Sequence, residues 1–395
     1  MTLSVRSKPY IIPEYSLTGD LLAFLTCGLQ YRYQNKGTLP PSMPIQLWFG
    51  EFIHGVLEEA YLQWRDHNLK EFPWDWKKEI RPIEMLIDKR MRARGLNPPS
   101  NLFCPYNEEG HKLGFCEDLN HPHKLVASQR AEAAINTWGP HLFPLITSAE
   151  VRLKGIRDMP HYQEGFSRSN YYGITGIVDV ISSVNLEVHS SSNLLVKFLE
   201  EDPLFKEKVQ ALDSKEYEII MDYKGMKRAP LSSSTWDYHK WQILTYAWLR
   251  SRQEESSPVV KGILFYINEL VPFTKDMQDI KEDVVGENTD IIPQGNDLKE
   301  ILKWKTNTPP PRLSEEFKTR RSLRLVDVKP DSVHHSLGEF DQVVDEIENC
   351  LLKEIKGKGI QNSWEARPEA RTCDACDFRT FCNNPDPLSQ KPTVP

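Results

Sequence analysis

The feature of the sequence that most constrains its fold is a change of hydrophobic period in the centre of the chain. Four short stretches there are rich in Val, Ile and Tyr and are bounded by Gly, Asn, Ser or Pro, as β-strands are: 148–153, 173–182, 217–224 and 259–270. The segment between the last two, 233–252, has the length and the Trp, Leu and Tyr content of a helix packed on a sheet. This order predicts an α/β fold with a central mixed β-sheet flanked by helices.

Helical patterns lie on both sides of this centre. Apolar residues recur every three or four positions over 44–64, 124–138 and 340–355. The segment 70–123 is rich in Pro, Trp, Asn and charge, which indicates an insertion with one short basic helix at 82–94. Residues 274–312 are polar and acidic and end in three prolines, so we expect a loop or linker there.

The charge of the chain excludes one class of nucleic-acid protein. A formal net charge of −7 is incompatible with a protein coated in positive charge, such as a histone-like DNA packager. A nucleic-acid enzyme needs only a local basic surface. Three groups offer one, although each can also be ordinary solvated charge: Lys89, Arg90, Arg92 and Arg94; Lys224, Lys227 and Arg228; and Lys318, Arg320, Arg321 and Arg324.

Neither a membrane segment nor a secretion signal is expected. The longest apolar runs are far shorter than the ~18 residues of a membrane span, and the first residues have no apolar segment of a signal peptide. We therefore expect an intracellular protein. In a reducing compartment its 7 cysteines are more often metal ligands, catalytic groups or buried thiols than disulfides.

An Asp-x-Lys pair closes one of the predicted strands. Asp222 and Lys224 are two residues apart, so both side chains face the same side of that strand. A carboxylate can bind Mg²⁺, and a neighbouring lysine can orient water or neutralise charge that develops on a phosphate. An isolated pair of this kind is also common on protein surfaces. Asp179 follows Gly176 in a strand of Ile and Val, where a carboxylate needs either a salt bridge or a metal.

Four further residues could contribute to the same chemistry. Glu150 is a third carboxylate, or else a solvated strand end. Gln242 and Tyr246 are four apart on a helix and face the same way, so both can bond a phosphate or a water; without context, a surface Gln and a core Tyr are the simpler interpretation. His54 lies on an apolar helix face, where a histidine is ordinarily a core residue.

The cysteines form a separate pattern. Cys373, Cys376 and Cys382 give the spacing C-x2-C-x5-C, and both zinc and iron–sulfur clusters commonly take four protein ligands. Cys27 and Cys350 are the candidates for the fourth ligand, and spacing alone does not separate zinc from iron–sulfur. A second group matches no established zinc spacing, and we expect unliganded loop residues there: Cys104, His111, Cys116, His121 and His123.

Taken together and in order, these motifs resemble one known arrangement. They are Cys27, His54, Glu150, Gly176-x2-Asp179, Asp222-x-Lys224, Gln242-x3-Tyr246 and Cys373-x2-Cys376-x5-Cys382. The set is similar to the PD-(D/E)XK nucleases of the RecB-like class with a four-cysteine iron–sulfur cluster, which includes the Cas4 proteins and exonuclease V. Asp222 departs from the family pattern, in which Glu is more usual, but it still offers a carboxylate.

The resemblance implies a catalytic role and a ligand set for each motif. The implied activity is hydrolysis of phosphodiester bonds in DNA with Mg²⁺ or Mn²⁺ bound by His54, Asp179 and Asp222. The resemblance assigns Cys27 and the three C-terminal cysteines to a [4Fe–4S] cluster. The catalytic residues that it implies are Asp179, Asp222, Lys224, Gln242, Tyr246 and Glu150.

Composition and the resemblance together predict a domain organisation. The resemblance gives an N-terminal helical part of the nuclease domain (1–69), the nuclease core (124–273) and a C-terminal helix with the cysteine cluster (336–385), and composition gives an insertion (70–123), an insertion or linker (274–335) and a mobile tail (386–395).

The expected substrate is DNA, single-stranded or with free ends, in repair, recombination or nucleic-acid defence. The 395 residues contain no G-x4-G-K-[ST] motif, so we expect no fused helicase. Unwinding would come from a helicase or single-strand-binding partner, unless the substrate is already single-stranded. Two alternatives remain open: a catalytically silent nucleic-acid-binding scaffold with an iron–sulfur or zinc site, and a zinc-stabilised RNA-processing nuclease.

Overall fold

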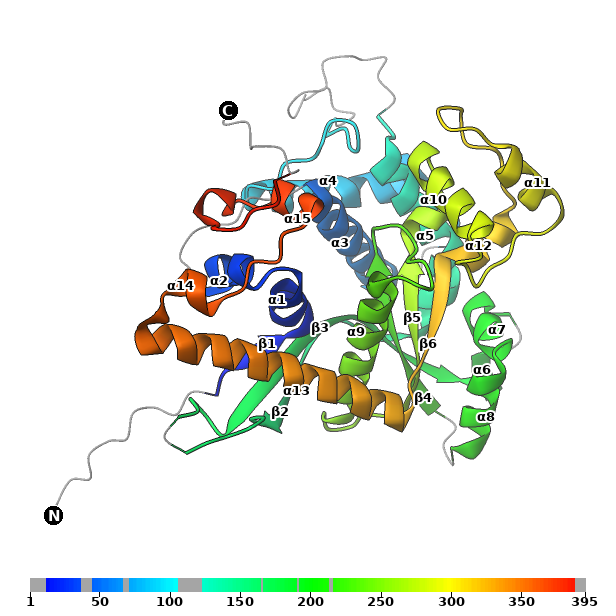
Figure 1. The fold of residues 1–395 in the computed structure, drawn as a ribbon. Helices are drawn as coiled ribbons and strands as arrows, with labels where there is room; N and C mark the ends of the chain where they lie inside the picture. The colour runs from blue at the N-terminus through cyan, green and yellow to red at the C-terminus, as the bar shows by residue number, and fades with distance from the viewer. Residues whose placement is uncertain are drawn as a thin grey trace.

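A six-stranded mixed sheet occupies the centre of the molecule (Figure 1). The computed structural model describes residues 12–36, 45–66, 71–105, 123–164, 166–189, 192–212 and 216–387. The strands are β1 (Glu14–Ser16), β2 (Ile146–Asp158), β3 (Tyr171–Asn185), β4 (Glu216–Lys224), β5 (Val259–Tyr266) and β6 (Leu323–Asp327). Their order is β1-β3-β4-β5-β6, with β2 also paired to β3. The pairs β1–β3 and β4–β5 are parallel and the others antiparallel, which confirms the predicted mixed sheet.

Helices cover the sheet and also lie in the parts of the described chain between β1 and β2 and after β6. They are α1 (Leu22–Thr26), α2 (Gly28–Lys36), α3 (Ile45–Asp66), α4 (Arg81–Ala93), α5 (Val126–Leu142), α6 (Leu186–His189), α7 (Leu194–Glu200), α8 (Pro203–Ala211), α9 (Ser234–Ser251), α10 (Thr274–Val285), α11 (Gly295–Lys303), α12 (Glu315–Ser322), α13 (Pro330–Lys353), α14 (Ile360–Ser363) and α15 (Ala370–Asp374). The helices predicted over 44–64, 82–94, 124–138, 233–252 and 340–355 are therefore confirmed as α3, α4, α5, α9 and α13. No helix in the described part of the chain is long and apolar enough to span a membrane.

Two hydrophobic cores lie on opposite faces of the sheet. In β4, Met221 packs with α3, α4 and α5, whereas its neighbour Ile220 packs with α9 and α13. Adjacent residues in β5, Ile263 and Leu264, divide in the same way. Because side chains alternate along a strand, this division assigns one face to the α3-side core and the other to the α9-side core.

The alternation breaks at one point in β2 and β3. Val178 belongs to the α9-side core and Val180 to the α3-side core, although residues two apart normally share a face. The partner strand changes face at the same level, where Glu150 has a left-handed φ of 51°. The pairs Ala149↔Val180 and Val151↔Val178 flank this point, so Glu150 lies opposite Asp179. The sheet therefore bends at two of the candidate site residues.

Glycines in the strands allow α9 to lie close to the sheet. A Cβ added to Gly176 would be 2.7 Å from the Tyr246 ring, and one added to Gly262 would be 2.1 Å from Ile243 Cγ2. Neither distance is compatible with a normal contact, so a side chain at either position would push α9 away. The missing side chain at Gly176 therefore leaves room for the Tyr246 ring against β3.

Helices α1 and α2, near the start of the described chain, lie beside α14, near its end (Figure 1). The Leu29 N–H donates to the Glu365 carbonyl at 3.0 Å. Arg32 forms a bidentate ion pair with Glu354 at 2.6 and 2.7 Å. The Trp364 ring lies 5.9 to 6.2 Å, centroid to centroid, from rings of α1 and α2. These contacts place α1 and α2 against the segment that carries the three C-terminal cysteines.

The expectation of a loop over 274–312 is wrong. The segment contains α10 and α11 and has a hydrophobic cluster of its own with the start of α12: Met277, Ile280, Ile301, Trp304, Leu313 and Phe317. Its helices are short and carry few apolar residues among many charges, so the helical period is weak. Strands β1 and β6 are also absent from the sequence prediction, and the strand predicted to 270 ends at Tyr266, followed by a 3₁₀ turn.

Part of the predicted insertion and of the predicted tail lies outside the described residues. These parts are 106–122, with His111, Cys116 and His121, and 388–395. Cys104 and His123 are described, and Cys104 Sγ lies 3.3 Å from His123 Nδ1. The division of the chain into domains stays a prediction.

Candidate active site

Three carboxylates lie in a row across β2, β3 and β4. The antiparallel ladder between β3 and β4 ends at the pair Val180↔Met221, so the next residues, Asp179 and Asp222, are neighbours. Glu150 lies opposite Asp179 on the other side. Directly opposite residues of antiparallel strands bring their side chains together. The strand register therefore gathers acids from three separate parts of the sequence.

His54 brings an imidazole to this row from α3. Its Nδ1 is 3.4 Å from Asp179 Oδ1 and 4.0 Å from Glu150 Oε1. One ligand atom from each of His54, Glu150 and Asp179 lies within 4.8 Å of the other two, a spacing that can hold a metal ion. His54 Nε2 is 2.9 Å from the Tyr223 carbonyl oxygen. Because a carbonyl only accepts, Nε2 carries the hydrogen, and in a neutral ring the Nδ1 lone pair is then available to a metal ion held between His54 and the carboxylates.

The peptide groups of Tyr223 orient two of these three residues. The Tyr223 N–H donates to Asp179 Oδ2 at 2.6 Å, which leaves Oδ1 facing His54. The Tyr223 ring is buried and contacts the rings of His54 and Phe265 edge-on at 5.7 and 5.9 Å. The middle residue of the Asp-x-Lys motif thus acts through its backbone, for which the sequence gives no signal.

Lys224 connects the carboxylate row to α9. Its Nζ is 2.5 Å from Asp222 Oδ2 and donates to Gln242 Oε1 at 2.7 Å. Gln242 Nε2 in turn donates to the Tyr246 hydroxyl at 2.9 Å. Asp222 is 2% exposed and Gln242 7%, so the interpretations of a surface Asp-x-Lys pair and a surface Gln are wrong.

The site is crowded with negative charge. Burial and the neighbouring Asp179 carboxylate raise the pKa of Glu150 to about 7. Burial raises the pKa of Asp222, and the Lys224 ammonium offsets this only in part. Burial lowers the pKa of His54, but the carboxylates of Asp179, Asp222 and Glu150 outweigh it and raise the pKa to about 9. A divalent cation among these oxygens would offset the repulsion between the carboxylates, which adds to the effect of burial on Glu150 and Asp222.

One acidic residue of this region is absent from the sequence prediction. Glu58 lies one helical turn after His54 on α3, and its charge contributes to the raised pKa of Glu150. The four-residue spacing from His54 is the signal that could have identified it, because residues four apart share a helix face.

The four cysteines of the predicted cluster line one pocket. Cys27 follows α1, and Cys373, Cys376 and Cys382 come from the C-terminal segment. Burial, with smaller contributions from the sulfurs of Cys27, Cys373 and Cys382, raises the pKa of the Cys376 thiol to about 11. Cys350 lies on α13 and does not line the pocket, so of the two candidates the structure brings Cys27 to the triplet. Backbone N–H groups of Asp386 and Asn384 donate to Cys373 Sγ and Cys382 Sγ at 3.4 Å.

Most of the basic residues singled out in the sequence are engaged in ion pairs. Arg90 and Arg94 of α4 pair with Glu59 and Glu51 of α3. Arg228, Arg321 and Arg324 are buried and paired with carboxylates, so these three do not form a basic surface for phosphate.

Comparison with known families gives one match. A family model described as the PD-(D/E)XK nuclease superfamily matches residues 209–383. The matched region contains Asp222, Lys224, Gln242, Tyr246 and the cysteine triplet, whereas His54, Glu150, Asp179 and Cys27 precede it. No curated protein matches the chain. The mixed sheet flanked by helices is consistent with a PD-(D/E)XK core over these residues.

Proposed function

We propose, from the PD-(D/E)XK superfamily domain at 209–383, that this protein is a metal-dependent deoxyribonuclease that hydrolyses phosphodiester bonds. The observation that carries the proposal is the convergence of His54, Glu150 and Asp179 within 4.8 Å beside the buried Asp222–Lys224 pair. Four of these five residues come from the register of three strands, and the fifth from a helix that packs on them.

The donor set fits Mg²⁺ or Mn²⁺. Asp179 Oδ1 and Glu150 Oε1 offer hard oxygen ligands, and His54 Nδ1 offers a nitrogen. Asp222 is buried beside them without enough positive charge to balance it. When bound, the ion supplies Lewis acidity and lowers the pKa of a coordinated water. The residues Asp179 and His54 are pre-oriented for binding by the Tyr223 backbone.

Lys224 is the residue that would contact the phosphate or the attacking water. Its ammonium is held between Asp222 and Gln242, so little movement is needed to stabilise charge on a phosphate oxygen. Tyr246 fixes the orientation of the Gln242 amide, and Gly176 makes room for the Tyr246 ring. The chain of hydrogen bonds from Tyr246 to Lys224 thus sets the direction of the ammonium.

We further propose that Cys27, Cys373, Cys376 and Cys382 hold a [4Fe–4S] cluster. The four cysteines line one pocket, and four thiolates are the usual ligand set of a [4Fe–4S] cluster. The N–H···S bonds from Asp386 and Asn384 are of the kind that tune iron–sulfur sites.

The proposed substrate is DNA, single-stranded or with free ends, supplied by a helicase or single-strand-binding partner. Among the described residues, Cys27, Cys350, Cys373, Cys376 and Cys382 form no disulfide, in line with the proposed reducing, intracellular setting for repair, recombination or nucleic-acid defence.

The test is cleavage of end-labelled single- and double-stranded DNA by anaerobically purified protein with Mg²⁺, Mn²⁺ or EDTA. We expect metal-dependent cutting that Lys224→Ala removes, while Lys154→Ala, a change in an exposed ion pair of β2, leaves it intact. Equal activity of the two variants would assign the cutting to a contaminant. Binding without cutting under all conditions would favour the scaffold alternative.

The cluster has its own test. Iron and acid-labile sulfide should be present together, with absorption near ~400 nm. Cys27→Ser should lose both, and Cys350→Ser should keep both. Stoichiometric zinc with no iron in protein prepared under anaerobic conditions would reject the cluster.

A further inference from the structure

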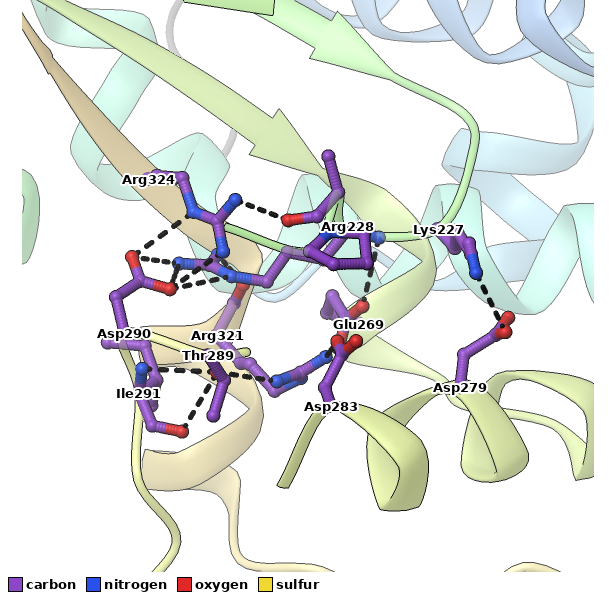
Figure 2. Close-up of polar contacts among 12 residues, drawn as sticks. Lys227, Arg228, Glu269, Asp279, Asp283, Thr289, Asp290, Ile291, Arg321 and Arg324 are labelled. Carbon is purple, nitrogen blue, oxygen red and sulfur yellow. Dashed lines mark hydrogen bonds and ion pairs between the residues drawn. The ribbon is translucent and has the colours of Figure 1, made fainter. Parts of the chain in front are cut away.

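Three buried arginines gather with acidic residues in one cluster (Figure 2). The side chains of Arg228, Arg321 and Arg324 are 0, 1 and 2% exposed. They come from three different places: the loop 225–233 between β4 and α9, the end of α12, and β6. A buried guanidinium requires a counter-charge, because desolvation of an unpaired ion is costly.

Asp290 supplies the counter-charge for two of them. Arg228 Nη2 donates to both Asp290 oxygens at 2.7 and 2.8 Å, and Arg324 donates to the same two oxygens at 2.8 and 3.1 Å. Asp290 lies in the connection between α10 and α11. Arg321 is bound separately, by Glu269 at 2.6 Å and Asp283 at 2.8 Å.

Residues 288–290 and β6 also form hydrogen bonds with the backbone of the loop 225–233. Arg324 Nη1 donates to the Ala229 carbonyl. The Leu231 N–H donates to the Asn288 carbonyl at 3.2 Å, and the Ser232 hydroxyl donates to Asn288 Oδ1 at 2.9 Å. The loop therefore has its side chain, carbonyl and amide contacts with residues 288–290 and β6.

This loop joins the two elements that carry the lysine and its partner. Lys224 is the last residue of β4 and lies four residues before Arg228. Gln242 lies on α9, the helix that begins directly after the loop. A displacement of the loop would therefore move Lys224 and Gln242 relative to each other.

A second connection runs through two aromatic side chains. The Tyr266 ring lies 5.5 Å from the Arg228 guanidinium and 5.8 Å from that of Arg324. Tyr266 is the register partner of Lys224, and its hydroxyl donates to His239 Nδ1 at 2.9 Å. Burial and the charges of Lys224 and Arg324 lower the pKa of His239 to about 3, so the ring is neutral and its Nδ1 can accept.

We infer that Asp290 is a positioning residue for Lys224: by binding Arg228 and Arg324 it fixes the loop 225–233, and so the segment from α10 to β6 sets the distance between Lys224 and Gln242. The inference rests on the proposed function for its catalytic consequence. It gives the segment 274–327 a role in catalysis without contact with substrate.

The first test does not depend on activity. In full-length Asp290→Asn, which keeps the shape of the side chain and loses its charge, amide hydrogen exchange of 225–233 should accelerate, on the order of 10-fold, since local opening becomes easier. Glu315→Gln is the matched control, because it removes an exposed carboxylate of the same segment whose partner, Lys318, lies outside the loop. Unchanged exchange in Asp290→Asn would overturn the inference whether or not the protein is a nuclease.

The second test is single-turnover cleavage of single-stranded DNA with Mn²⁺. Asp290→Asn should lower the rate on the order of 10- to 100-fold through misplacement of Lys224, with KM for DNA changed less than about 2-fold. In a Gln242→Ala background the same substitution should have little further effect, because both act through the position of Lys224. Additive losses in the double variant would indicate general destabilisation and reject the positioning role.

If Asp290→Asn folds poorly, Arg228→Lys provides the test instead. It keeps the charge beside Asp290 but loses the two-pronged contact. It should show the same loss of rate and the same accelerated exchange, and normal values for both would reject the inference. A wild-type protein without cleavage would reject the proposed function alone, since the exchange of 225–233 still decides whether Asp290 fixes the loop.

Discussion

Two groups of buried charges lie on either side of the loop 225–233, and they differ in how their charge is balanced. In the candidate active site, Glu150, Asp179 and Asp222 share one lysine and one histidine, and the pKa values of Glu150 and Asp222 are raised. In the arginine cluster, defined by Arg228, Arg321 and Arg324, three cations meet the carboxylates of Glu269, Asp283 and Asp290.

Asp290 differs from Glu150 and Asp222 in the direction of its pKa shift, whereas burial raises the pKa of Asp283 in the arginine cluster as well. Burial favours the neutral acid at Asp290, but Arg228 and Arg324 hold its pKa well below the usual range. The arginine cluster is complete without a ligand, whereas the active site has an excess of negative charge that a divalent cation can balance. The difference teaches that the imbalance of buried charge, more than the number of buried charges, distinguishes a site built for a ligand from one built for stability.

The largest expected effect concerns activity. Asp179→Asn should reduce DNA cleavage about 1,000-fold, because it removes a proposed metal ligand. Its stability should be equal to or greater than that of the wild type, since it relieves repulsion among the three acids. Cleavage kinetics together with urea unfolding measure both quantities. A large loss of stability would mean that Asp179 is a structural ion-pair residue and would remove the contrast between the two groups.

The second prediction reverses this pattern in the arginine cluster. Asp290→Ala should lower the free energy of unfolding by about 3 kcal/mol, because it leaves two buried arginines without a counter-charge. This value is at the low end for a buried pair because the Asp290 side chain is 34% exposed. Asp279→Ala, in a more exposed pair, should cost about 1 kcal/mol or less. Equal losses for the two substitutions in urea unfolding would show that the cluster is not specially stabilising.

The third prediction concerns metal binding. Mn²⁺ at about 100 times its Kd should stabilise the protein by about 2.7 kcal/mol. The melting temperature should rise by a similar amount in the wild type and in Asp290→Ala, because the arginine cluster needs no cation. Asp179→Asn should lose this rise. A rise that persists in Asp179→Asn would place the cation elsewhere.

The smallest expected effect depends on pH. A carboxyl group whose pKa is lower in the folded state contributes stability above its unfolded pKa of about 3.9, and this contribution falls as the pH drops towards the folded pKa. The difference in unfolding free energy between wild type and Asp290→Asn should therefore be constant from pH 7 to about 5 and should shrink below about 3.9. Urea unfolding of both proteins across this range measures the difference, and a difference that grows in acid would contradict the assigned ion pairs.

Local periodicity is sufficient to predict the parts of the site that lie within one element. Asp222 and Lys224 share a strand face, and Gln242 and Tyr246 share a helix face, so their spacing alone predicts that each pair projects together. His54 has no such local signal, and only the resemblance to RecB-like nucleases associates it with the carboxylates. Its place depends on how α3 packs on the sheet, which is a long-range property.

The arginine cluster shows why the rest could not be predicted. Arg228 and Asp290 are far apart in the sequence, and each looks like a solvated surface charge until β6 is placed beside β5. Strand β6 itself escapes the pattern because Arg324, a buried residue, reads as polar. The backbone contacts of Tyr223 with His54 and Asp179 carry no sequence signal at all, since any residue has the same amide and carbonyl groups.

The contact between α1, α2 and the segment 354–365 has a consequence for synthesis of the protein. Helices α1 and α2 are translated well before their partners Trp364, Glu365 and Glu354. Until then the aromatic side chains of Phe24 and Tyr31 have no Trp364 ring to pack against, and the other three cysteines of the Cys27 pocket have not been translated. Contacts this distant in sequence form slowly, because a long loop must close first. A chain that stops before residue 360 is thus damaged at its opposite end, in α1 and α2.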